Sequence, residues 1–369
     1  MSLQHVTRTF IAFITIRDWY LGASLVVLYA LGLVASISIA QGGNEGRVAR
    51  QLVFVGSGLA LAIGFARTAT HRLRAAALPC YAAMLALLGL VLVAGVNIRG
   101  TRGWFSFGFF NLQPVEFMKL ALVLMLAAYF EKSRFLVSSW KRFLVSGIFS
   151  GIPILLVLKQ PDVGSALVLG VIWLVLALSQ LSVRRVLFLA GLGIIIATIA
   201  WLFLLKPYHK ERMFVVLNPQ LDPYGVGYNT RQALIAIGSG MLTGRGIGAG
   251  SQGHLRFLPE VATDFPFAII AEELGFVGAL IVCVALMVVI GRTMYAAQHV
   301  RDDFSSFLAF GIGVWIFFQS FVNLGMSLGL LPVIGLPLPF ISYGGSSILA
   351  VSCAAGIVLG MRTVRAQSE

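Results

Sequence analysis

The stretch from 254 to 280 places a carboxylate, Asp264, between a polar loop and an apolar run. Pro266 follows two residues later, and proline suits the first position of a helix because its missing N–H is not needed there. This pattern predicts that Asp264 lies directly before a helix, at the edge of a membrane. Asp264 or Thr263 could simply be the N-cap of that helix. Alternatively, a carboxylate at such a boundary could act as a general base.

Three further carboxylates lie close to Asp264 in the sequence, namely Glu260, Glu272 and Glu273. Two of them fall in or near an apolar span, where ionisable groups are costly and are commonly functional. Their negative charge would raise the affinity of Asp264 for a proton, which suits a general base. The same acids could instead bind a metal ion together with Asp264, or only shape the loop.

A second set of acids follows two Gln-Pro pairs. Glu116 comes shortly after the first pair, at 113–114, and Asp162 directly follows the second, at 160–161. Acids near a helix N-terminus are favoured by its dipole, and this explains both without any function. Lys119 lies three residues after Glu116, so the two side chains share a helix face and can form an ion pair. The pair could be structural or could contact a substrate directly.

The longest polar stretch, about 206–265, carries basic residues that suit an anionic ligand. We expect Arg212 and Arg245 to bind a pyrophosphate or lipid headgroup, because guanidinium pairs with phosphate through two parallel hydrogen bonds. Glycines between 238 and 250 would allow a close approach to such a group, although they could equally form a plain flexible loop. They match no Walker pattern, so we do not predict a nucleotide-binding loop.

Near the end of the chain, the residues 331–347 combine three prolines with an adjacent Gly-Gly pair at predicted membrane depth. Backbone that is not helical is tolerated there only where it is buried in protein or lines a cavity. We therefore predict a broken or re-entrant segment, with a glycine-mediated helix contact as the simpler alternative.

The composition is that of a membrane protein. Of 369 residues, 59% are hydrophobic and 11% charged, and the mean hydropathy is +0.93, whereas a soluble protein has about 25% charged residues. We predict an all-α polytopic membrane protein, a single domain over 1–369, in which the long loop separates helices 7 and 8. The ten predicted spans, each near the 20 residues that a bilayer requires, are about 18–39, 51–67, 77–97, 114–131, 142–158, 163–180, 185–205, 267–291, 304–328 and 341–361.

The basic residues predict the orientation. If both termini are cytoplasmic, 15 Lys and Arg residues lie in inner segments and 5 in short outer loops, as the positive-inside rule requires. The long loop with Asp264 would then face outward. The net charge of +13 is explained by topology, so no nucleic-acid partner is expected. The three cysteines lie in apolar runs without paired spacing, which argues against disulfides or a metal cluster.

With these motifs in view, the chain resembles the SEDS family of bacterial cell-wall proteins (shape, elongation, division and sporulation), and it is most similar to the elongation branch. The resemblance extends from the third loop to the last helix. The matching stretches are QPVEFMK at 113–119, QPDVGSAL at 160–167, NP at 218–219, DP at 222–223, AIGSG at 236–240, FLPE at 257–260, TDF at 263–265, AEELG at 271–275 and PFISYGGS at 339–346.

The resemblance implies a peptidoglycan glycosyltransferase that polymerises lipid II, a disaccharide-pentapeptide on undecaprenyl pyrophosphate, during cell elongation and shape maintenance. It implies that Asp264 is the essential aspartate, that Glu116, Lys119 and Asp162 support it, and that the protein resides in the bacterial cytoplasmic (inner) membrane. Implied partners are a class B penicillin-binding transpeptidase and the membrane proteins of the elongation complex. No cofactor is certain, although a divalent cation (Mg or Mn) would suit the leaving pyrophosphate.

Three alternatives to this function remain at the level of sequence. A lipid II flippase would also need many spans, intramembrane acids and broken helices. A non-catalytic scaffold for the transpeptidase is the second alternative. A member of the division branch of the same family is the third.

Overall fold

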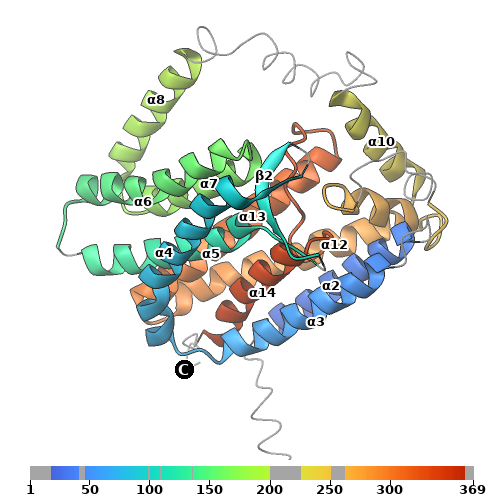
Figure 1. Ribbon diagram of the computed structural model, residues 1–369, viewed down its shortest axis with the longest axis horizontal. Coiled ribbons are helices and arrows are strands. Elements are labelled where there is room, and N and C mark those ends of the chain that lie inside the picture. Colours follow the sequence, from blue (N-terminus) through green and yellow to red (C-terminus); the bar gives the residue numbers. More distant parts are fainter. Residues whose placement is uncertain are drawn as a thin grey trace, which may run out of the picture.

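The computed structural model describes residues 18–40, 46–98, 100–108, 110–134, 136–199, 226–250 and 262–361. Most of this is helix, arranged as a packed bundle (Figure 1). The helices are α2 (Trp19–Ala40), α3 (Gly46–Ala66), α4 (Thr70–Ala94), α5 (Pro114–Ser133), α6 (Ser139–Lys159), α7 (Val163–Leu178), α8 (Val183–Ile199), α10 (Val226–Ser239), α12 (Pro266–His299), α13 (Asp303–Ser327) and α14 (Gly345–Gly360).

A helix overlaps each of the ten predicted ranges. Within the described residues, α2, α3, α4, α6, α12 and α13 are long and apolar enough to cross a membrane, and α7 and α14 are shorter apolar helices. The protein is therefore a mostly helical, multi-pass membrane protein. The last predicted range was too long at its start, because α14 begins only at Gly345, after a stretch of irregular backbone. Much of the predicted long loop lies outside the described residues, and α10 occupies part of the remainder.

A small antiparallel sheet follows α4, and the sequence did not predict it. Its strands are β1 (Val96–Ile98), β2 (Thr101–Ser106) and β3 (Asn111–Leu112), in that order. Gly100 and Gly108 turn the chain between them with φ of 81° and 72°, a region that glycine enters without a steric penalty. Nε of Arg102 donates to the carbonyl of Gly95 at 3.1 Å, so this residue stabilises the end of α4.

Small residues set the closest helix contacts, as is usual in membrane bundles. A Cβ added to Gly356 of α14 would lie 2.3 Å from the carbonyl oxygen of Ala62 in α3, and one on Gly360 would lie 2.3 Å from that of Ala66. The two helices therefore pack backbone against backbone. At the bundle centre, α5 buries side chains around most of its circumference, including Val115, Leu122 and Phe130.

In contrast, α8 stands apart from the other helices in Figure 1. Of its side chains that the structure describes, none is buried. The candidate site is positioned by other elements, namely α5, α7, α12, α13 and the irregular backbone before α14.

Candidate active site

The irregular backbone between α13 and α14 joins the site together. This proline-rich segment, residues 331–344, contains no helix, yet Leu336, Leu338 and Phe340 are buried at 1% exposure. It packs closely on two helices: a Cβ on Gly164 of α7 would lie 2.8 Å from the carbonyl oxygen of Ile334, and one on Gly32 of α2 would lie 2.7 Å from that of Ile341. The prediction of a broken segment buried in protein is confirmed.

Asp264 lies in a turn directly before α12. As predicted, α12 begins with Pro266, but its N-cap is Phe265, whose side chain makes no capping hydrogen bond. The N-cap position, one of the two alternatives considered for Asp264 and its neighbour Thr263, is therefore taken by Phe265. The backbone of this turn is held by the proline-rich segment and by α13.

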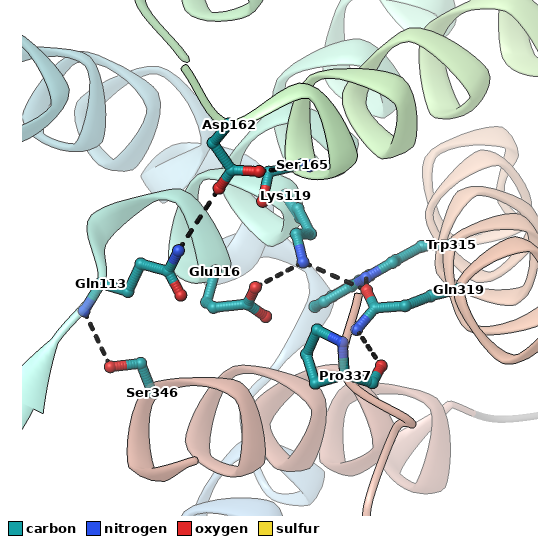
Figure 2. A network of polar contacts seen from close by, with 9 residues as sticks. All are labelled: Gln113, Glu116, Lys119, Asp162, Ser165, Trp315, Gln319, Pro337 and Ser346. Atoms are coloured by element: carbon teal, nitrogen blue, oxygen red, sulfur yellow. Dashed lines mark hydrogen bonds and ion pairs between the residues drawn. The ribbon is translucent and has the colours of Figure 1, made fainter. Parts of the chain in front are cut away.

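Glu116 and Lys119 form the predicted ion pair inside the bundle. Nζ of Lys119 lies 2.6 Å from Oε1 of Glu116, and the two side chains are 0% and 2% exposed. Burial of this kind requires further hydrogen bonds to offset the lost hydration. Nζ of Lys119 also donates to Oε1 of Gln319 on α13 at 3.1 Å (Figure 2). Among the described residues, Oε2 of Glu116 has no hydrogen-bond partner.

Gln319 extends this network to the proline-rich segment. Its Oε1 also accepts from Nε1 of Trp315 at 2.8 Å, and its Nε2 donates to the carbonyl of Pro337 at 2.8 Å. Lys119 lies 5.8 Å from the centre of the Trp315 ring, within the range of a cation–π contact. Both polar atoms of the Gln319 side chain therefore form hydrogen bonds within this network (Figure 2).

Asp162 is the N-cap of α7. Its Oδ1 accepts from the backbone N–H of Ser165 at 2.9 Å, and its Oδ2 accepts from Nε2 of Gln113 at 3.4 Å. The backbone N–H of Gln113 in turn donates to Oγ of Ser346 in α14 at 2.9 Å (Figure 2). Both Gln-Pro motifs thus meet at one place, and Asp162 holds the start of α7 against the start of α5.

The networks of Lys119 and Asp264 converge on neighbouring carbonyls of the proline-rich segment. Gln319 donates to the carbonyl of Pro337, while Asn323, one turn further along α13, donates to the carbonyl of Leu336 at 2.7 Å and to that of Asp264 at 2.8 Å. Both Asp264 and the Glu116–Lys119 pair are therefore linked through α13 to the same segment, although Asp264 lies far from that pair in sequence.

Two glycines between 238 and 250 lie against the backbone of α12. A Cβ on Gly240 would lie 1.9 Å from the carbonyl oxygen of Ala271, and one on Gly244 would lie 2.0 Å from that of Glu273. Gly240 and Gly244 therefore allow the turn to approach the backbone of α12. The reason is a break in α12 at Gly275, where φ is 66° and ψ is −160°.

Glu272 and Glu273 lie at this break and are 0% and 1% exposed. The backbone N–H of Arg245 donates to the carbonyl of Glu272, and that of Gly246 to the carbonyl of Glu273, both at 3.0 Å. Oε1 of Glu273 accepts from the backbone N–H of Gly248 at 3.1 Å and from Oγ of Ser38. Of the three roles considered for these acids, the contacts favour shaping the loop.

The other predicted ligands divide into those that the structure describes and those that it does not. Arg245 is exposed, and its Nε donates to the carbonyl of Ser239 at 3.3 Å. Arg212 and Glu260 lie outside the described residues. In the described part of the chain, no three His, Cys, Asp or Glu side chains form a group that could hold a metal ion.

Sequence reasoning did not identify Gln319, Asn323 or Ser342. A signal was present for the first two, because Gln319, Asn323 and Ser327 recur every four residues in an apolar span and so share one helix face. For Ser342 no such spacing exists, because it lies in irregular backbone.

The sequence of this chain is similar to those of known cell-wall proteins. A family model described as "Cell cycle protein", for FtsW, RodA and SpoVE, matches residues 11–367. Peptidoglycan glycosyltransferase MrdB of Escherichia coli is 36% identical over 348 residues, 92% of this chain and 93% of that protein. The probable peptidoglycan glycosyltransferase FtsW of Haemophilus influenzae is 43% identical over 283 residues, 74% of this chain and 70% of that protein.

Solved structures share the fold. A chain from a structure reported as "Structural coordination of polymerization and crosslinking by a peptidoglycan synthase complex" matches with a TM-score of 0.79 and 33% identity, covering 93% of this chain and 96% of that one. The rod shape determining protein RodA of Thermus thermophilus matches with a TM-score of 0.69 and 32% identity, covering 93% and 95%.

Proposed function

This chain belongs to the SEDS family of cell-wall proteins, and on that premise we propose that it is a peptidoglycan glycosyltransferase that polymerises lipid II. The observation that carries the proposal is the convergence of Asp264 and the buried Glu116–Lys119 pair on one broken segment of a membrane bundle. Buried charge in a span is costly and is retained for function. The Escherichia coli relative that is named a glycosyltransferase matches 92% of this chain.

The reaction is an inverting glycosyl transfer. The donor is a growing glycan whose MurNAc C1 carries an α-linked lipid pyrophosphate, and the acceptor is lipid II. The 4-hydroxyl oxygen of the acceptor GlcNAc attacks C1, Asp264 accepts its proton, and the C1–oxygen bond to pyrophosphate breaks with its electron pair. A β-1,4 bond forms, and one positioned base is sufficient for such a displacement.

The departing pyrophosphate requires positive charge nearby. Lys119 is already paired with Glu116 and Gln319, so its role is to organise the buried network. The exposed Arg245 and the loop residue Arg212 are the better candidates for the pyrophosphate. A divalent cation (Mg or Mn) would supply the same charge, and Glu260 and Asp162 complete the set of supporting acids.

We propose a setting in the cell envelope for this reaction. The protein is a multi-pass inner-membrane protein, and we place ten spans in it, with both termini cytoplasmic and Asp264 on the outer side. Its role is cell elongation, with a class B penicillin-binding transpeptidase and other elongation-complex membrane proteins as partners. In support, the structural relative with the highest similarity reported above is part of a synthase complex for polymerisation and crosslinking.

Polymerisation of purified lipid II by the detergent-solubilised protein tests the proposal. Replacing Asp264 with Asn removes the base and should lower glycan synthesis at least about a hundredfold, while the melting temperature stays unchanged. The matched control is Asp303→Asn at the opposite end of the bundle, where an exposed pair with Arg134 contributes little. Full activity of Asp264→Asn would refute the assignment. Glycan chains would also exclude a pure flippase, and EDTA tests the divalent cation.

A further inference from the structure

The backbone around Asp264 is held at three consecutive carbonyls. The carbonyl of Ala262 accepts from the backbone N–H of Tyr343 at 2.9 Å, that of Thr263 accepts from Oγ of Ser342 at 2.7 Å, and that of Asp264 accepts from Nδ2 of Asn323 at 2.8 Å. A turn before a helix normally leaves such groups to solvent. Here each is fixed by a donor from a distant part of the chain.

Asn323 is the most constrained of these donors. It is 0% exposed, and its amide contacts two carbonyls, those of Asp264 and Leu336, at 2.8 and 2.7 Å. A carbonyl can only accept, so the atom between them must be the NH₂ group, and the orientation of the amide is settled by chemistry. Both hydrogens of that group are used, which joins the Asp264 turn to the proline-rich segment.

This link also fixes the surface that faces the carboxylate. Gly335 directly precedes Leu336, and a Cβ added to it would lie 3.7 Å from Oδ2 of Asp264. The backbone of Gly335 therefore lies near the carboxylate of Asp264, and the bond from Asn323 to Leu336 holds this backbone. One side chain thus sets both the backbone of Asp264 and the position of its neighbour.

We propose that Asn323 is a positioning residue for Asp264, with Ser342 as its auxiliary; this inference rests on the function proposed above. A general base must lie within hydrogen-bond reach of the hydroxyl that it deprotonates. A displacement of about 1 Å can lower a rate roughly a hundredfold. Because Asn323 is one turn from Gln319 on α13, it also keeps the base in a fixed relation to the Lys119 network.

The test is Asn323→Asp, which preserves shape and replaces the double donor with an acceptor. We expect the polymerisation rate to fall about tenfold to a hundredfold, while KM for lipid II changes less than about twofold. The solvent deuterium isotope effect should rise above that of the wild type, because proton transfer to a displaced base becomes slower. A smaller folded fraction would lower the rate and leave the isotope effect unchanged.

Ser320→Ala is the matched control. Ser320 lies one turn from Asn323 on the same helix, is 3% exposed, and its hydroxyl has no hydrogen-bond partner among the described residues. Its removal should change neither the rate nor the isotope effect. If Asn323→Asp does not fold, Ser342→Ala removes one donor to the same turn, and we expect a smaller loss of rate with the same rise in isotope effect.

A wild-type rate, or a lower rate with an unchanged isotope effect, in both folded variants would overturn the positioning role. Failure of the proposed function gives a different result. In that case the wild type makes no glycan, or Asp264→Asn remains active. If Asp264→Asn is inactive and the Asn323 and Ser342 variants match the wild type, only the positioning role is rejected.

Discussion

Of the ion pairs between described residues, Glu116–Lys119 is the most deeply buried, with side chains 2% and 0% exposed. The mutual attraction of a buried pair is largely offset by lost hydration, so the pair as a whole contributes little net stability. Removal of one partner is different, because it leaves the other charge buried and uncompensated. Lys119 also donates a hydrogen bond to Gln319, and this bond links its positive charge to the candidate active site.

We therefore expect Lys119→Met to destabilise the protein by about 3–5 kcal/mol. The double variant Glu116→Gln/Lys119→Met removes both charges and should recover most of that loss. Thermal unfolding in detergent measures both effects. If the double variant were as unstable as the single one, packing around the Lys119 side chain, and not charge, would be the cause.

At the scale of elements, α12 is two helical pieces joined at Gly275. Its backbone there lies in a region that essentially only glycine occupies. The break frees carbonyls that the turn 240–246 satisfies: Arg245 and Gly246 donate to Glu272 and Glu273. The first piece of α12 begins beside Asp264, so the break and the glycine turn together orient the start of the helix that follows the base.

Gly275→Ala should destabilise the protein by about 1–3 kcal/mol or more, from the backbone strain alone. An added Cβ would in addition lie 2.3 Å from the backbone nitrogen of Gly244. Gly291→Ala is the matched control in the same helix, because nothing lies within 4 Å of its added Cβ. Thermal unfolding should separate the two, and equal melting temperatures would show that the break is not required.

Across the whole molecule, charge is divided between the two ends of the bundle. The ion pairs Arg74–Glu131, Arg134–Asp303 and Arg292–Asp18 lie at the helix ends that the sequence assigns to the cytoplasm. The start of α12 with Asp264, and the starts of α5 and α7, belong to the opposite helix ends. Basic residues are retained on the cytoplasmic side of the membrane. With the ion-paired helix ends in the cytoplasm, we expect Asp264 to face the outer side.

Cysteine labelling in intact cells tests the orientation. In a background without Cys80, Cys283 and Cys353, a membrane-impermeant maleimide should label Thr243→Cys in intact cells. It should label Arg301→Cys only after permeabilisation. Both positions are exposed, so accessibility within the protein is matched. The reverse pattern would invert the topology and remove Asp264 from the outer surface.

Local patterns in the sequence were sufficient for much of the fold. Apolar runs of spanning length located the helices, because hydrophobic length is a property of one segment alone. Pro266 located the start of α12, and the three-residue spacing of Glu116 and Lys119 produced an ion pair within one helix. The family resemblance that singled out Asp264 is likewise contained in the sequence, and it is confirmed at the level of the family.

Only the tertiary structure determined what surrounds these residues. Asn323 meets Asp264 across 59 positions of sequence, Ser342 meets Thr263 across 79, and Gln319 meets Lys119 across 200. Local sequence carries no information on such pairs, because they arise from packing between helices and from irregular backbone. For the same physical reason, the sequence could place Asp264 beside a helix but could not reveal that Asn323 and Ser342 hold the backbone of this turn.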